Sequence, residues 1–190
     1  MAGHLGDPAA ARDGLGDPDP MVRATAIGAL ERLGALIADD LTVLLGGPGD
    51  PSPVVRRRAA EAAARIPAVH LRPALDDGEW SVVEMACWAL GEHEETDDAT
   101  LERLVALAGG HCEPLVREAA VAALGAIGDE RGLAAVIAAT HDKAAVRRRA
   151  AVALAAFDGP EAHAALTRLL TDRDWQARQI AEDLLEAPRR

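Results

Sequence analysis

Few residues in this sequence have types and spacing that could do chemistry. The densest cluster is Glu-His-Glu-Glu at 92–95, whose imidazole and carboxylate groups can bind metal ions. A single His-Glu step without further ligands at metal-binding spacing indicates a solvated acidic turn, so we expect no metal site. Cys87 and Cys112 are too few for a disulfide framework or a zinc quartet, and we interpret them as buried free thiols in a reducing compartment.

Acid–base catalysis would require carboxylates whose environments separate their pKa values. Glu61 and Glu84 are a possible pair, but nothing in the sequence favours such a pairing. The sequence also has no Gly-rich phosphate loop and no nucleophile elbow. We therefore predict no catalytic residue and no cofactor, and we leave an enzymatic role open.

The composition favours helices and argues against nucleic acid as the partner. Hydrophobic residues make up 49% of the 190 residues but aromatic residues only 2%, and alanine, the best helix former, is abundant. Strand-forming residues are scarce, which predicts an all-α fold. The net charge of −11 disfavours binding to polyanions. Arginine greatly outnumbers lysine, a bias typical of a GC-rich bacterial genome.

The first residues lack the basic and apolar regions of a signal peptide. No apolar run reaches the roughly 18 residues that cross a bilayer. We expect a cytoplasmic protein with no membrane partner.

A repeated helical unit organises the chain, and its best copy is 113–129. We number each copy from its first apolar residue, position 0, which is usually followed by arginine at position 1, alanine at 4 and Ala-Leu at 7 and 8. Successive copies are 27 to 34 residues apart, a spacing typical of helical repeat proteins. Position 0 falls at Val22, Val55, Val82, Val116, Val146 and Ala177.

Positions 0, 4, 7, 8 and 11 fall on one face of a helix, and this face predicts the core. A second apolar run follows each motif, at 36–45, 68–75, 99–108, 131–139 and 161–170, and the first 14 residues could supply a leading helix. One hairpin cannot bury its apolar face alone, so neighbouring hairpins must stack. We predict one α-solenoid domain over 1–190 with five to six hairpins. Left-handed glycines are expected near the motif-helix ends, at Gly34, Gly91, Gly128 and Gly159.

Three segments carry a family resemblance: Asp-Pro-Asp-Pro-Met-Val-Arg at 17–23, Leu-Val-Arg-Glu-Ala-Ala-Val-Ala-Ala-Leu-Gly at 115–125 and Ala-Val-Arg-Arg-Arg-Ala-Ala-Val-Ala-Leu at 145–154. They resemble HEAT repeats, in particular the short bacterial type of phycobilisome lyase-like proteins. The resemblance implies a right-handed α-solenoid that serves as a protein-binding scaffold, with the Val-Arg helices on its concave side.

The resemblance also implies that the arginines at position 1 brace the turns of adjacent repeats. They are Arg23, Arg56, Arg117, Arg147 and Arg178, with Asp19, Asp50, Asp142 and Asp174 as candidate partners. The third copy has Val83 in this slot, so we predict that the departing copy, 82–95, is the functional one.

On this geometry, positions 2 and 6 face the groove. Trp88 occupies position 6 of the third copy, where the repeat requires no large side chain, and tryptophan is enriched among interface anchors. The alternative is that Trp88 packs on adjacent helices. Trp80 and Trp175 are expected to act as hydrophobic staples. The predicted partner-binding groove consists of Arg57, Glu61, Glu84, Trp88, Glu118 and Arg148.

We therefore predict a non-catalytic scaffold that binds a protein or peptide in this groove. One alternative is an enzyme or chaperone-like modifying protein, akin to the lyases, that holds a small molecule or peptide against Trp88. A second alternative is nucleic-acid binding through the arginine triplets at 56–58 and 147–149, although acidic residues share the same face.

Overall fold

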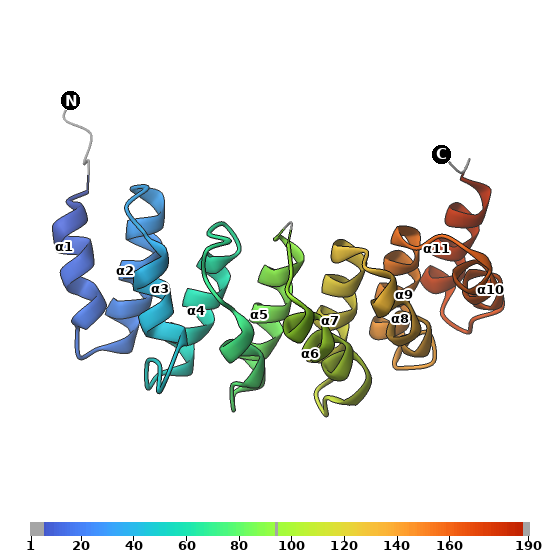
Figure 1. Cartoon of the computed structure of the whole chain (residues 1–190), viewed down its shortest axis with the longest axis horizontal. Coiled ribbons are helices and arrows are strands. Elements are labelled where there is room, and N and C mark those ends of the chain that lie inside the picture. Colours follow the sequence, from blue (N-terminus) through green and yellow to red (C-terminus); the bar gives the residue numbers. More distant parts are fainter. Residues whose placement is uncertain (1–5, 94, 188–190) are drawn as a thin grey trace. The chain divides into compact units, whose positions relative to one another are not determined.

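The structure is all-helical throughout the part of the chain that it describes. The computed structural model describes residues 6–93 and 95–187, which form eleven α-helices and four short 3₁₀ helices without a strand (Figure 1). The prediction of an all-α fold is confirmed. The chain divides into two compact units, Met1–Ala89 and Leu90–Arg190, with the boundary inside helix α5. That the whole chain forms one continuous domain stays a prediction.

The first unit is built from short helices that pack in sequence order. Helix α2 lies against α4, α1 lies against α2, and α3 lies against α4. The elements are α1 (Pro8–Asp13), η1 (Gly14–Gly16), α2 (Pro20–Arg32), α3 (Ala38–Leu45), α4 (Pro53–Ala63), η2 (Arg72–Asp76) and most of α5 (Trp80–Gly91).

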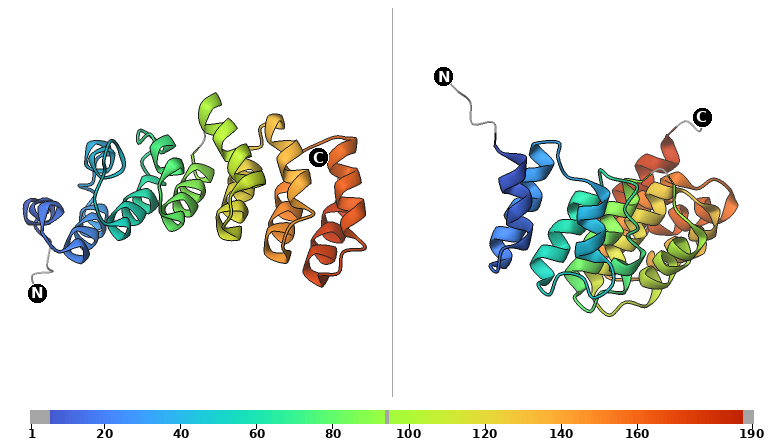
Figure 2. Two further views of the ribbon diagram at one scale, coloured as in Figure 1. Left: turned by 90° about the horizontal axis from the view of Figure 1, so that it is seen from below. Right: turned by 60° about the vertical axis from the view of Figure 1, so that its left-hand side comes forward.

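The second unit repeats this arrangement with longer helices. Helix α7 lies between α6 and α9, and α11 packs against both α9 and α10 (Figure 2). After the last residues of α5, the elements are α6 (Asp98–Gly110), α7 (Pro114–Ile127), η3 (Glu130–Gly132), α8 (Leu133–Ala139), α9 (Ala144–Ala153), η4 (Leu154–Ala156), α10 (Pro160–Leu169) and α11 (Trp175–Glu186).

We call the helices that carry the Val-Arg motif or its equivalent the motif helices; they are α2, α4, α5, α7, α9 and α11. The sequence pattern suggested that each pairs with the apolar run after it. Instead α4, α7, α9 and α11 each contact the helix that precedes them in the chain, α7 and α9 more closely than the helix that follows. The motif helices α4, α9 and α11 also pack on the motif helix before them. The short leading helix α1 is therefore the first member of the first hairpin.

Position 0 is the centre of the core, as predicted, in every motif helix but the first. Val55, Val116 and Ala177 are completely buried, and so are the equivalent residues of α5 and α9. Val22 differs, with 41% of its surface exposed. The described chain before α2 contains only the six-residue α1 and one 3₁₀ turn, which do not cover the side of α2 that bears Val22.

Proline or tryptophan begins most motif helices. Pro20, Pro53 and Pro114 occupy the first turn, where a missing N–H costs no intrahelical bond. Trp80 and Trp175 are likewise the first residues of their helices, and 41% and 64% of their surfaces are exposed. A hydrophobic staple starts from the residue before the cap, so the prediction that these tryptophans act as staples is wrong.

Glycines have two different roles at the helix ends. Gly34, Gly128 and Gly159 have positive φ, as predicted. Gly91 does not; a Cβ there would lie 3.3 Å from the Cα of Ala123. Gly91 is needed because two helices approach closely, and Gly125, also at position 9, is needed for the same reason.

Gly125→Ala should destabilise the second unit. Its new Cβ would lie 2.7 Å from the Cα of Ala153, so α7 and α9 would have to separate. We expect a loss of about 1–3 kcal/mol in the free energy of unfolding, measured by urea denaturation. Gly109→Ala is the matched control, because its Cβ would meet no atom within 4 Å and alanine favours the helix. Equal stability of the two variants would contradict this account of the helix contact.

Candidate functional site

In four motif helices, the arginine at position 1 binds an aspartate in the turn that precedes the following motif helix. In the first unit, Nε and Nη2 of Arg23 donate to the carboxylate of Asp50 at 2.7 and 2.8 Å. Arg56 makes the same two bonds to Asp77 at 2.6 and 2.8 Å. The remaining nitrogen, Nη1, donates to a backbone carbonyl before the helix, that of Asp17 for Arg23 and that of Asp50 for Arg56.

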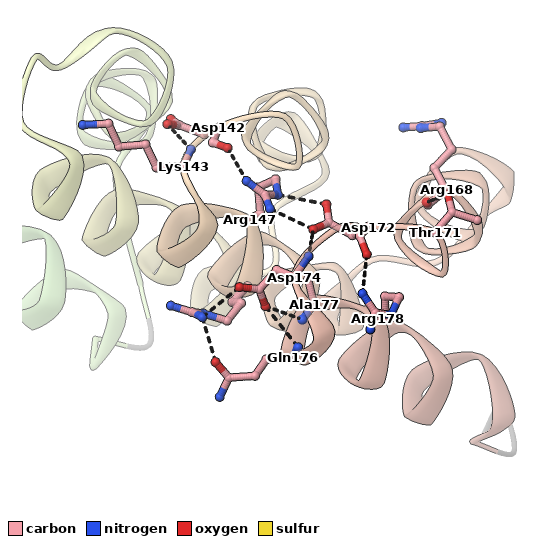
Figure 3. A network of polar contacts seen from close by, with 11 residues as sticks. Asp142, Lys143, Arg147, Arg168, Thr171, Asp172, Asp174, Gln176, Ala177 and Arg178 are labelled. Carbon is pink, nitrogen blue, oxygen red and sulfur yellow. Dashed lines mark hydrogen bonds and ion pairs between the residues drawn. The ribbon is translucent and has the colours of Figure 1, made fainter.

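The second unit has the same pairs, which we call rungs. Arg117 binds Asp142 at 2.6 and 2.7 Å, and Arg147 binds Asp172 at 2.9 and 2.8 Å (Figure 3). Arg147 is almost completely buried, with 4% of its surface exposed. In all four rungs the two side chains are at most 20% exposed. Each rung is therefore a bidentate ion pair largely shielded from water, a geometry in which Arg–carboxylate bonds are strong.

The rung aspartates also accept backbone N–H groups, which fixes their turns. Asp50 accepts from Ser52, Asp77 from Glu79 and Asp172 from Asp174. The hydrogen bonds from Arg147 lower the pKa of Asp172 against the opposing effect of burial. For Asp50, burial is the largest influence and raises the pKa, but the bonds from Arg23 and Ser52 outweigh it and leave the pKa lowered.

The structure confirms two of the four predicted aspartate partners. Asp50 and Asp142 form rungs, whereas Asp19 and Asp174 accept N–H groups at the starts of their own helices. An aspartate three residues before position 0 caps its own helix and does not pair with the arginine at position 1. Asp174 accepts instead from Arg148, at position 2. Sequence reasoning missed the partners Asp77 and Asp172, although both lie five residues before a position 0.

The sequence omits one rung altogether. Val83 replaces the arginine of the third motif helix, and the slot five residues before Val116 holds His111. Nδ1 of His111 accepts the N–H of Glu113 at 3.1 Å, which preserves the local turn that an aspartate makes elsewhere. The donor and the acceptor of this rung have thus been replaced together.

The predicted groove residues of the first unit lie on α4 and α5. Arg57 is exposed, Glu84 is half-buried, and Trp88 has 42% of its surface exposed. Glu61 forms an ion pair with Arg58 on the same helix at 2.9 Å. Arg57, Glu84 and Trp88 are therefore available to a partner.

The two predicted groove residues of the second unit are used within the chain. Arg148 donates to Asp174 at 3.0 Å and to Gln176 at 2.7 Å, at the start of α11. Glu118 lies 3.6 Å from Arg149. That all six predicted residues form one groove stays a prediction.

Three exposed apolar residues that sequence reasoning missed extend this face. Met21, Val54 and Leu115 each stand one residue before position 0 and are exposed. Val152 is also exposed, at position 6, which was predicted to face the groove. The residue at −1 lies seven residues from position 6, two helical turns away on the same face. The Met-Val, Val-Val and Leu-Val pairs were the available signal, because only one member of each pair can face the core.

Two further features of the described chain bear on function. No described helix is long and apolar enough to cross a membrane. Within residues 6–93 and 95–187, no three His, Cys, Asp or Glu side chains are grouped as a metal site would require. Glu94 lies outside the described residues, so the acidic turn at 92–95 stays a prediction. Cys87 is buried as predicted, but the prediction is wrong for Cys112, which is exposed in the turn between α6 and α7.

Helical hairpins stacked through a repeated motif define an α-helical repeat protein of the solenoid class. The sequence profile of HEAT repeats matches residues 1–65, 68–144 and 101–186. The chain belongs to the HEAT-repeat family. No curated protein matches it.

Solved structures with similar folds have different functions. An engineered protein shares 22% identity at a TM-score of 0.69, covering 95% of this chain and 98% of its own. A designed armadillo repeat protein in complex with the peptide (KR)4 shares 20% identity at 0.65, covering 94% and 98%. The complex of CpcE and CpcF of phycocyanin lyase from Nostoc sp. PCC7120 shares 23% at 0.67, covering 97% and 78%. At these identities the likenesses establish the fold alone.

Arg147→Ala should destabilise the chain strongly, because it leaves the Asp172 carboxylate unpaired between two repeats. We expect a loss of about 3–5 kcal/mol, measured by urea denaturation. Arg65→Ala is the control: its ion pair with Glu31 is on the surface, with 75% of the arginine side chain exposed, and should contribute less than about 1 kcal/mol. Similar losses in both variants would refute a special role for the buried rung.

The rungs should also make stability depend on pH. The hydrogen bonds from Arg117 lower the pKa of Asp142 in the folded state. Its contribution is therefore fully present above the unfolded pKa of about 3.9 and is lost as pH falls through the folded value. We expect Asp142→Asn to have a lower Tm than the wild type near neutral pH, with the difference shrinking in acid. A difference that stays constant with pH would argue against the ion pair.

Proposed function

We propose that this chain is a non-catalytic scaffold that binds a protein or peptide segment along the exposed face of its motif helices. The observation that carries the proposal is Trp88, whose indole is 42% exposed on a face where the repeat needs no large side chain. A partner that covers this ring would gain the burial of a large apolar surface.

Two charged side chains of the predicted groove suggest what the partner offers. Among the described residues, Arg57 has no carboxylate partner, so its guanidinium is free to bind a carboxylate in bidentate fashion. Glu84, one turn before Trp88, has no ion-pair partner within the described chain and can accept from a basic group. A segment with an apolar side chain between an acidic and a basic residue would complement these three side chains.

The exposed apolar residues at position −1 support contacts beyond one repeat. Met21 and Val54 present the same geometry on α2 and α4, and Leu115 does so on α7. Repeated geometry at a regular step suits one extended partner. The designed armadillo protein bound to a peptide and the two-protein lyase complex support the general class, since both share this fold.

The experiment compares two exposed tryptophans. Peptides selected on the wild-type chain from a phage-displayed random library are titrated against Trp88→Ala and Trp175→Ala. We expect Trp88→Ala to weaken binding by about 30-fold or more, the loss of a hot-spot side chain. Trp175 is 64% exposed at the start of α11 and is not one of the predicted groove residues, so Trp175→Ala should bind as the wild type does.

Equal effects of the two substitutions, or failure to select any peptide, would count against the scaffold. The nucleic-acid alternative is tested with a single-stranded and a duplex oligonucleotide at low salt. Tight binding that falls steeply with salt would favour that alternative over the scaffold.

A further inference from the structure

One face of α2 is covered only in part: Ala26 at position 4 is buried close to Gly14, whereas Val22 at position 0 is exposed. Met21, Val22, Thr25, Ala26 and Ala29 line a depression of about 330 Å³ there. Three of these residues, Val22, Ala26 and Ala29, occupy positions 0, 4 and 7, the positions that face the preceding repeat in the other motif helices. Position 0 is completely buried in the other five motif helices, but Val22 is 41% exposed. This apolar surface, which we call the α2 end face, shares Met21 with the face that carries Trp88, but Val22, Ala26 and Ala29 at positions 0, 4 and 7 lie outside that face.

Asp17 beside the α2 end face is arranged like a rung aspartate. Its carboxylate accepts the N–H of Asp19 at 2.8 Å, as that of Asp50 accepts from Ser52. Its carbonyl oxygen accepts from Arg23, as that of Asp50 accepts from Arg56. Within the described chain no arginine reaches the Asp17 carboxylate, so this rung has an acceptor without a donor.

The last motif helix, α11, carries a charged residue at a position that is apolar in the earlier motif helices. Position 5 is apolar and completely buried in the five earlier motif helices, where it is Ile27, Ala60, Cys87, Val121 and Ala151. In α11 the same position is Glu182, and position 9 is Glu186, and both are exposed. Polar outer faces on terminal repeats keep solenoids from stacking further.

This difference excludes the α11 side of a second copy as the natural occupant of the α2 end face. Arg178 at position 1 could reach Asp17, since among the described residues it donates only to the carbonyl of Asp172. Stacking α11 on α2 would, however, bury Glu182 and Glu186 against apolar side chains, and unpaired buried carboxylates cost several kcal/mol.

We propose that the α2 end face is a docking surface for a different helical repeat protein, whose terminal helix presents small apolar side chains and an arginine that completes the rung with Asp17. The depression fits apolar side chains, because Val22, Ala26 and Ala29 line it together with Met21 and Thr25. Small apolar residues such as Ala60 and Ala151 occupy position 5 of other motif helices. The open carboxylate supplies charge complementarity, and an arginine is required because the rung geometry is bidentate.

The chain itself provides a defined probe for this surface. In the double variant Glu182→Ala/Glu186→Ala, α11 gains the alanine found at position 5 of α4 and α9 while Arg178 stays in place. We expect this variant, once circular dichroism shows that it is folded, to bind immobilised wild-type chain in a concentration-dependent manner. Wild-type chain in solution should not bind.

Substitutions on the immobilised chain then locate the contact. Val22→Asp and Asp17→Arg should each weaken binding of the double variant at least about 10-fold, whereas Trp88→Ala should leave it unchanged. Adding Arg178→Glu to the probe should abolish binding to the wild type and restore it to Asp17→Arg, which identifies the rung itself.

Several results would overturn the proposal. These are no binding of the folded probe, binding that Val22→Asp does not weaken, or self-association of the wild type that Val22→Asp removes, which would assign the face to a second copy. A marked fall in the Tm of the wild-type chain on Val22→Asp would also overturn it, because the chain's own residues would then cover the face. None of these results bears on peptide binding beside Trp88.

Discussion

The structure depends on the bidentate pair between an arginine at position 1 and an aspartate in the following turn. Alanine-rich helices can approach closely, as α7 and α9 do where Gly125 faces Ala153. Small side chains interlock little, however, so they do not by themselves fix how one repeat is aligned along the next. The pair supplies that alignment, because two parallel N–H···O bonds hold both side chains in one geometry. The guanidinium also donates to a carbonyl of its own turn, so one side chain links three segments.

A scaffold held by such pairs leaves one face of each motif helix without a structural duty. Arg57 and Trp88 lie there with nothing in the repeat that requires them. In the second unit, some side chains at the corresponding positions are already engaged in ion pairs, such as Arg148 with Asp174. The first unit therefore offers the more available surface, and it contains the copy that departs from the motif at Val83.

The repeat made the fold predictable, since position 0 and the proline starts recur with helical spacing. That position-1 arginines pair with aspartates of neighbouring turns was predictable, but which aspartates do so was not. Asp19 and Asp174 were expected to be partners, whereas Asp77 and Asp172 form the ion pairs. Which residue of a turn pairs with the arginine of the preceding motif helix depends on where the following helix begins. The rung aspartates lie four or five residues before position 0, whereas an aspartate three residues before it caps the helix. The exposure of Val22 was not predictable either, because the motif that defines position 0 is complete in α2 and nothing within the motif distinguishes Val22 from the buried copies.

The most direct test of the scaffold is photo-crosslinking from its exposed face. Benzoylphenylalanine is placed at Glu84, beside Trp88, or at Glu102, an exposed residue of α6 away from the motif helices. Irradiation in a lysate of the native source should crosslink one discrete protein from position 84 and nothing from 102. Crosslinks to nucleic acid at 84, or the same protein products from both positions, would contradict a specific protein-binding face.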